Sequence, residues 1–158
     1  MTYKGWEYIP NIITEFEAKL IRNYNNKHSK EGLDKARGLV KTIYIPKASS
    51  FLMKRLQPIV EKIVGEEVYP TYWFNTTYYK DCYMVPHTDR PSCEIGVSLN
   101  IYSNVNWPLK LYDLSNITQE VVTPMMDGVL YEGTKLTHWR DKLTKDTEFM
   151  QTFCHFVR

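Results

Sequence analysis

The sequence predicts an α+β domain in which two N-terminal helices precede a double-stranded β-helix, or jelly-roll, core. Three observations support this fold class. Apolar residues recur at helical spacing in two stretches of the first 66 residues. From residue 68 onward, the apolar stretches become short and rich in β-branched and aromatic residues. Pro, Gly, Asn and Asp separate these later stretches, as is typical of strands joined by turns.

The first predicted helix covers residues 14–26. Thr14 is followed three residues later by Glu17, which is the pattern of a capping box at a helix N-terminus. The spacing of the apolar residues predicts that one face of this helix packs on the core. These residues are Phe16, Leu20, Ile21 and Tyr24.

The second predicted helix covers residues 49–64, and Pro58 is expected to kink or restart it. Between the two helices, residues 27–38 are polar and charged, which predicts a surface loop with a solvated His28. The apolar face of the second helix would consist of Leu52, Leu56, Ile59, Val60 and Ile63.

The remaining chain reads as at least six strands, so we expect one domain over residues 1–158, with a helical part at 1–66 and the jelly roll at 67–158. No internal repeat is visible. The predicted strands lie within residues 68–79, 93–102, 109–114, 120–124, 128–133 and 148–157.

Composition limits the classes of partner. The formal charge is only +2, from 20 basic and 18 acidic residues, which speaks against a nucleic-acid or membrane surface as partner. No apolar run approaches the roughly 20 residues that span a bilayer, and no signal-peptide pattern opens the chain. Three cysteines without paired spacing are expected to be reduced thiols. These features predict a cytoplasmic protein.

The tripeptide His87-Thr88-Asp89 is the first candidate site. Residues two apart on a strand share a face, so His87 and Asp89 can point at one centre while Thr88 points away. The alternative is a polar turn, because Pro86 and Pro91 flank the tripeptide.

A metal site needs at least a third protein ligand, and ferrous sites commonly use two histidines and one carboxylate. His138 follows two Gly turns and an apolar stretch, which places it at the start of a late strand. His155 lies within the last strand, and a buried histidine hydrogen-bonded to a neighbour is the expected role there. His28 lies in the polar segment.

Taken together, Tyr78, residues 87–89, residues 127–131 and His138 resemble the pattern of the Fe(II)- and 2-oxoglutarate-dependent dioxygenases. The likeness is strongest to small microbial and phage members related to prolyl 4-hydroxylases. It covers roughly residues 70–157, and residues 8–21 resemble the strand-then-helix start of such proteins less specifically.

This resemblance implies that His87, Asp89 and His138 ligate Fe(II) and form the catalytic centre. The cosubstrates would be 2-oxoglutarate and O2, and the products succinate, CO2 and a hydroxylated C–H bond. A peptide or protein with a prolyl-like target, or a small molecule, would be the substrate.

The chain departs from the family at the cation that binds the distal carboxylate of 2-oxoglutarate. The family places Lys or Arg about ten residues after the distal histidine, where this chain has residues 147–149 without a cation. Arg140 is the preferred substitute, because a guanidinium can pair bidentately with a carboxylate. Alternatively, Arg140 is a surface charge paired with Asp141 or Glu132. The other candidate cations are Lys142, Lys145 and Arg158.

Further roles are implied for neighbouring residues. Tyr78 matches the family tyrosine that hydrogen-bonds the same carboxylate, or is one strand aromatic among 12 tyrosines. Asn100 is a candidate for orienting the cosubstrate. A specificity loop would come from residues 27–48 or 103–119. The candidates for substrate binding, which could equally be packing or rim residues, are Arg90, Tyr83, Trp139 and Trp107.

Two other functions remain open. A nucleic-acid demethylase of the same superfamily should carry two arginines after the distal histidine, and only Arg140 and Arg158 follow His138. The near-neutral charge also speaks against that reading. A non-catalytic metal-binding jelly roll is favoured by the missing downstream cation.

Overall fold

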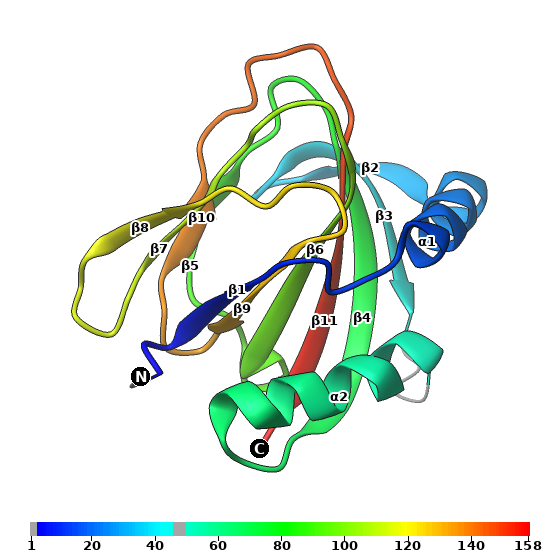
Figure 1. Ribbon diagram of the computed structural model, residues 1–158. Coiled ribbons are helices and arrows are strands. Elements are labelled where there is room, and N and C mark those ends of the chain that lie inside the picture. The colour runs from blue at the N-terminus through cyan, green and yellow to red at the C-terminus, as the bar shows by residue number, and fades with distance from the viewer. Residues whose placement is uncertain (1–2, 46–49) are drawn as a thin grey trace.

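The computed structural model describes residues 3–45 and 50–158, and these residues form two antiparallel sheets and two helices. Both helices lie against one face of the larger sheet, on the side away from the smaller sheet (Figure 1). The fold class predicted from the sequence, a jelly roll with two N-terminal helices, is therefore confirmed.

The larger sheet has seven strands in the order β1-β9-β6-β11-β4-β3-β2, all paired antiparallel. Its long central strands follow the β-branched and aromatic stretches of the sequence. The bounds are β1 (Trp6–Ile9), β2 (Lys30–Asp34), β3 (Gly38–Ile45), β4 (Tyr69–Tyr78), β6 (Ile95–Ser103), β9 (Gly128–Glu132) and β11 (Phe149–Val157).

The smaller sheet has four strands in the order β5-β10-β7-β8. In it, β10 pairs His138 with His87 of β5, so the sheet itself brings the two histidines together. A short 3-10 helix, Pro91–Cys93, joins β5 to the larger sheet. The bounds are β5 (Met84–His87), β7 (Leu109–Tyr112), β8 (Thr118–Val121) and β10 (His138–Arg140).

Helix α1 (Glu15–His28) begins at the predicted capping box, in which Thr14 and Glu17 exchange hydrogen bonds. Its buried face differs from the prediction. Ala18, Ile21 and Asn25 are buried, whereas three of the four predicted core residues are exposed. The exposed residues are Phe16, Leu20 and Tyr24, with Phe16 70% accessible.

Helix α2 (Phe51–Val64) begins after Ser50, and the predicted start at residue 49 lies outside the described residues. It runs through Pro58 without restarting, and its buried apolar face packs on the larger sheet. The predicted polar loop at 27–38 was wrong, because β2 and the start of β3 form a hairpin there. The segment before residue 67 therefore adds three strands as well as two helices.

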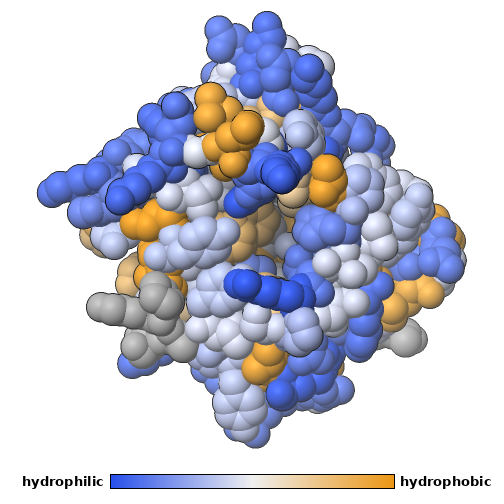
Figure 2. Space-filling view, turned by 180° about the vertical axis from the view of Figure 1, so that it is seen from behind, coloured by the Kyte–Doolittle hydropathy of each residue, from blue (hydrophilic) through white to orange (hydrophobic). Residues whose placement is uncertain are grey.

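Apolar side chains fill the space between the two sheets on either side of a central pocket. The pocket has a volume of about 480 Å³. On the face turned away from the viewer in Figure 1, a hollow with white to tan side chains inside it has both blue, hydrophilic and orange, hydrophobic side chains around it (Figure 2). Within the described part of the chain, neither helix is long and apolar enough to cross a bilayer.

Candidate metal centre

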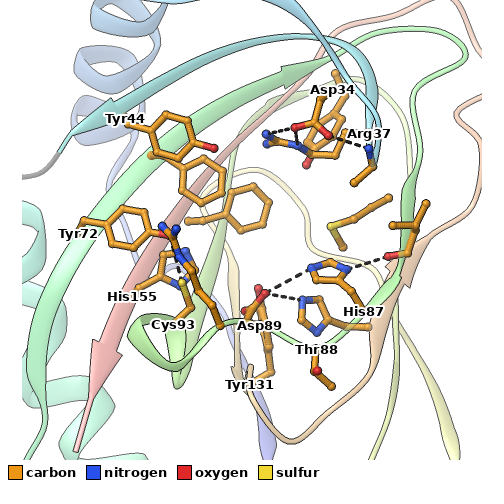
Figure 3. Close-up of a pocket in the computed structure, with 18 residues that line it drawn as sticks. Asp34, Arg37, Tyr44, Tyr72, His87, Thr88, Asp89, Cys93, Tyr131 and His155 are labelled. Atoms are coloured by element: carbon orange, nitrogen blue, oxygen red, sulfur yellow. Dashed lines mark hydrogen bonds and ion pairs between the residues drawn. The ribbon is translucent and has the colours of Figure 1, made fainter.

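The predicted triad converges on one point. His87 ends β5, Asp89 follows it by two residues, and His138 begins β10. One possible ligand atom from each of the three residues lies within 4.8 Å of the others. Asp89 Oδ1 is 3.3 Å from His87 Nε2 and 3.5 Å from His138 Nε2. Figure 3 shows the labelled Asp89 and His87 turned toward each other inside the pocket.

Backbone carbonyls fix both imidazoles. His87 Nδ1 lies 2.7 Å from the carbonyl oxygen of Val85, and His138 Nδ1 lies 2.9 Å from that of Leu136. A proton on Nδ1 satisfies each carbonyl, and Nε2 of each ring then faces Asp89. A hydrogen bond from Nδ1 to a backbone carbonyl is the arrangement by which proteins orient histidine ligands to a metal.

The charges around Asp89 favour its ionised form. Burial alone would raise the pKa of the carboxyl, but hydrogen bonds from His138 and His87 outweigh burial and hold it well below its usual range. The same hydrogen bond with Asp89 raises the pKa of His87. A buried carboxylate between two imidazoles is a ready set of ligands for a divalent transition metal.

Gly133 makes room for this carboxylate. The backbone N–H of Asp89 donates to the Gly133 carbonyl at 2.8 Å. A Cβ added at Gly133 would lie 2.4 Å from Asp89 Oδ2 and 2.5 Å from the carbonyl oxygen of Cys93. The backbone therefore approaches the ligand more closely than any residue with a side chain permits.

Arg140 lies in the interior, 1% accessible, and not on the surface. Its guanidinium lies over the rings of Trp107 and Phe149, 4.9 and 5.3 Å from their centroids, and one Nη donates to the Trp107 carbonyl. The alternative pairing with Asp141 or Glu132 is wrong, because Lys110 binds Asp141, and Arg158 and Lys135 bind Glu132.

The guanidinium of Arg140 therefore has N–H donors that remain available to a ligand. Its Nε and Nη2 are buried and have no partner among the described residues. Burial lowers the pKa of the guanidinium to about 10, so it stays protonated at neutral pH. A buried cation with two free donors is costly unless an anion is supplied to it.

Tyr78 lies beside Arg140 and borders the pocket. Its ring packs on Trp107 at 5.0 Å between centroids, and its hydroxyl is buried with no partner in residues 3–45 and 50–158. Burial raises the pKa of the phenol, while the charges of Arg37 and Arg140 oppose that rise.

The other candidate cations are exposed or paired with carboxylates. Lys142 is exposed and pairs with Asp81 at 3.0 Å, and Lys145 is exposed. Arg158 forms ion pairs with three carboxylates at the end of β11. These carboxylates belong to Glu66, Glu94 and Glu132.

Asn100 does not border the pocket. Its side-chain amide nitrogen donates to Ser103 Oγ at 2.8 Å and to the Thr123 carbonyl at 2.7 Å, which holds the turn region beyond β6. Its role in orienting a cosubstrate remains a prediction.

Of the four candidate substrate-binding residues, one borders the pocket and three do not. Arg90 borders the pocket and donates to the Tyr72 hydroxyl at 2.7 Å. Tyr83 and Trp139 lie outside the pocket lining: Tyr83 donates to the Lys35 carbonyl, and Trp139 packs on Tyr112. Trp107 is buried against Arg140.

Sequence reasoning missed the pocket residues from the β2–β3 hairpin. Arg37 Nε and Nη2 bind Asp34 at 3.0 and 2.6 Å, and Nη1 donates to Thr76 at 2.8 Å. Both Asp34 and Arg37 border the pocket opposite the triad (Figure 3). Residues 34–37 fall within one of the two segments named as possible specificity loops, which was the available signal.

His155 is buried, as predicted, but its imidazole makes no hydrogen bond with the described residues. Both ring nitrogens lack a partner in the described part of the chain, and the residue borders the pocket. Burial lowers its pKa to about 4, so the imidazole is neutral at pH 7.

Comparisons with known proteins identify the fold. No protein-family model matches the sequence, and no curated protein matches it significantly. Among solved structures, the chain is similar to a Pseudomonas putida prolyl-4-hydroxylase, with a TM-score of 0.75 and 11% identity, covering 98% of this chain and 93% of the other.

Two further structures show the range of ligands in this fold. HygX from Streptomyces hygroscopicus, solved with nickel, 2-oxoglutarate and hygromycin B, has a TM-score of 0.76 and 11% identity over 98% and 83% of the two chains. A Trichoplax adhaerens prolyl hydroxylase, in complex with a hypoxia inducible factor peptide fragment, has a TM-score of 0.66 and 18% identity over 97% and 84%. The chain thus has the fold of the 2-oxoglutarate–Fe(II) oxygenases, which confirms the resemblance noted in its sequence.

Proposed function

We propose that this protein is an Fe(II)- and 2-oxoglutarate-dependent dioxygenase. The observation that carries the proposal is the set His87, Asp89 and His138, whose ligand atoms lie within 4.8 Å of one another. These residues border a pocket that Tyr78 also borders. Two histidines and one carboxylate on one face are the ligand set of non-haem Fe(II) oxygenases.

The donors present fit both the metal and the cosubstrate. His87, Asp89 and His138 would hold Fe(II) through Nε2, a carboxylate oxygen and Nε2. Arg140 and Tyr78 would hold the distal carboxylate of 2-oxoglutarate, because the two free donors of Arg140 and the free phenol hydroxyl are otherwise unsatisfied.

Bound Fe(II) and 2-oxoglutarate would supply the oxidation, in which O2 gives one oxygen atom to the substrate and one to succinate while CO2 is released. The protein would contribute position and exclusion of water. The carbonyls of Val85 and Leu136 orient the imidazoles, and the apolar clusters on both sides of the pocket limit water around the metal.

For the substrate, we propose a C–H bond of a peptide with a prolyl-like residue; a small metabolite is the alternative. Support comes from the aromatic rings that border the pocket, which suit an apolar ring, and from the prolyl hydroxylases among the similar folds. The near-neutral charge disfavours nucleic acid. The three buried, unpaired cysteines support a cytoplasmic location.

The deciding experiment is an anaerobic titration of the protein with Fe(II) and then 2-oxoglutarate, followed by visible absorption. A charge-transfer band of the chelated keto acid is expected in the wild type and should be absent in His87→Ala. His28→Ala, which changes an exposed histidine of α1, should keep the band. Metal binding without the band would instead favour a non-catalytic metal-binding jelly roll.

A further inference from the structure

Three residues that border the pocket have buried polar side-chain atoms without a hydrogen-bond partner in the described part of the chain. They are Tyr78, Asp89 and His155. The proposed function accounts for Asp89 as a metal ligand and for Tyr78 as a cosubstrate ligand. His155 remains unexplained, with both ring nitrogens unpaired although the residue is only 3% accessible. Buried polar groups in native proteins nearly always have partners, so a bound ligand is the natural partner here.

His155 is too far along β11 to serve the cosubstrate anchor. The register of β11 and β4 pairs Phe149 with Tyr78 and His155 with Tyr72. Six residues of strand separate Phe149 from His155, a span of about 20 Å. Tyr78 and His155 both border the pocket, so the Tyr78 side of the proposed anchor and His155 lie far apart within it.

The proposed metal centre lies close to His155. Gly96 of β6 pairs with both His155 and Tyr131, and the Tyr131 ring packs on that of His138, 4.6 Å between centroids. In the view of Figure 3, His155 lies on the side of Asp89 away from His87. A group bound at His155 would therefore lie next to the proposed metal site, on the side of Asp89 away from His87.

Aromatic rings cover one side of His155. Its ring lies 4.9 Å from that of Tyr72 and 5.7 Å from that of Phe74, and Tyr44 stacks on Phe74 at 5.1 Å. We call Tyr44, Tyr72 and Phe74 the aromatic wall. Such a wall binds the apolar face of a ring, while a neutral imidazole offers one donor and one acceptor.

We propose that His155 is a substrate-recognition residue, which hydrogen-bonds the backbone amide of a peptide whose prolyl-like ring lies on the aromatic wall. The inference rests on the proposed function. A peptide backbone fits the requirement, because the carbonyl of one peptide unit can accept and the N–H of another can donate, as the two imidazole nitrogens need. Hydrogen bonding at this point would fix the target carbon beside the metal.

The test uses protein loaded with Zn(II), which does not support oxidation, and with 2-oxoglutarate. The probe is the blocked tripeptide acetyl-Ala-Pro-Ala-amide, and the readouts are its dissociation constant and the imidazole ¹⁵N resonances of labelled histidine. The peptide is expected to shift the His155 resonances. His155→Phe should weaken binding about tenfold, and His155→Gln, which keeps a donor and an acceptor, should weaken it less.

Matched controls separate recognition from general damage. His28→Phe makes the same exchange at an exposed position and should leave binding unchanged. Acetyl-Ala-Ala-Ala-amide lacks the ring and should bind more weakly than the prolyl peptide. Equal affinity of wild type and His155→Phe, or no binding of the prolyl peptide to the wild type at millimolar concentration, would overturn the inference.

The Fe(II)–2-oxoglutarate absorption band keeps the two proposals distinguishable. If the band forms in wild type and in His155→Phe while only peptide binding is lost, both proposals stand. If the band is lost in His155→Phe, His155 serves the metal or cosubstrate and the inference is wrong. If the wild type forms no band, the proposed function itself fails.

Discussion

The triad and the Arg140–Tyr78 pair are built in opposite ways. At the triad, each imidazole has a partner on both nitrogens: a backbone carbonyl on Nδ1 and Asp89 near Nε2. At the pair, Arg140 Nε and Nη2 and the Tyr78 hydroxyl are buried without partners among the described residues. The first site is organised before a ligand arrives, whereas the second is satisfied only by an anion.

The largest effect is expected at the organised site. Asp89→Ala removes the carboxylate that both imidazoles face, so 2-oxoglutarate turnover should fall to background. Succinate formation and the metal content after dialysis measure this. The exposed Asp146→Ala is the matched control and should behave as wild type. Wild-type turnover in Asp89→Ala would remove Asp89 from the ligand set.

At the Arg140–Tyr78 pair, we expect a substitution to change the affinity for 2-oxoglutarate rather than the affinity for the metal. Arg140→Met keeps an apolar side chain among the rings of Trp107 and Phe149 but removes the charge. Loss of a buried charged hydrogen-bond partner costs about 2–5 kcal/mol, so the 2-oxoglutarate requirement should rise at least about thirtyfold. Metal affinity without cosubstrate should change little.

The control for this change is Lys142→Met, which removes an exposed charge paired with Asp81. Titration calorimetry with Zn(II), and then with 2-oxoglutarate, separates the two affinities. An unchanged 2-oxoglutarate affinity in Arg140→Met would transfer the anchor to another cation, and Arg37, which borders the pocket, would be the next to test.

Burial of His155 should make the stability of the metal-free protein depend on pH. Its pKa falls from an ordinary value of 6.5 to about 4 in the folded protein, so the unfolded chain binds the extra proton first as pH falls. The free energy of unfolding of the metal-free protein should therefore decrease by about 3 kcal/mol as the pH falls from about 6.5 to about 4. Urea unfolding across this range should show the slope in wild type and a smaller one in His155→Phe. Equal slopes would contradict the buried neutral imidazole.

A subtler change disturbs the triad without removing a ligand. In Gly133→Ala, the new Cβ would lie 2.4 Å from Asp89 Oδ2, so the carboxylate must move. We expect metal affinity to fall about 10- to 100-fold, the usual cost of disturbing the shell around a ligand. Gly32→Ala, where a Cβ meets nothing within 4 Å, is the control. Unchanged metal affinity would show that the Asp89 side chain tolerates the displacement.

The sequence predicted the triad because its signals are local. The His87–Asp89 spacing follows strand alternation, and the two Gly turns before His138 mark the start of β10. Arg140 was predicted by its spacing from His138, but its burial depends on Trp107 and Phe149, which come from other segments. Local pattern cannot show which distant ring a side chain will meet.

Where the local sequence pattern and the tertiary packing favoured different structures, the observed structure follows the packing. The β2–β3 hairpin reads as a polar loop, yet β3 is held by pairing with β4, with Tyr44 opposite Phe74. In α1, the large residue Phe16 is exposed while Asn25 is buried, because the Asn25 amide donates to Thr77 of β4 at 2.8 Å. That hydrogen bond has no signature in the spacing of apolar residues.

The backbone of Val85 connects two parts of the pocket. Its N–H donates to the Ala36 carbonyl of the hairpin at 3.0 Å, and its carbonyl faces His87 Nδ1 at 2.7 Å. The neighbouring N–H of Tyr83 donates to the Arg37 carbonyl. A ligand that displaces the β2–β3 hairpin would therefore also displace β5, whose Val85 carbonyl orients the His87 ring. Binding in the pocket is therefore expected to change the orientation of the His87 ring through these two backbone hydrogen bonds.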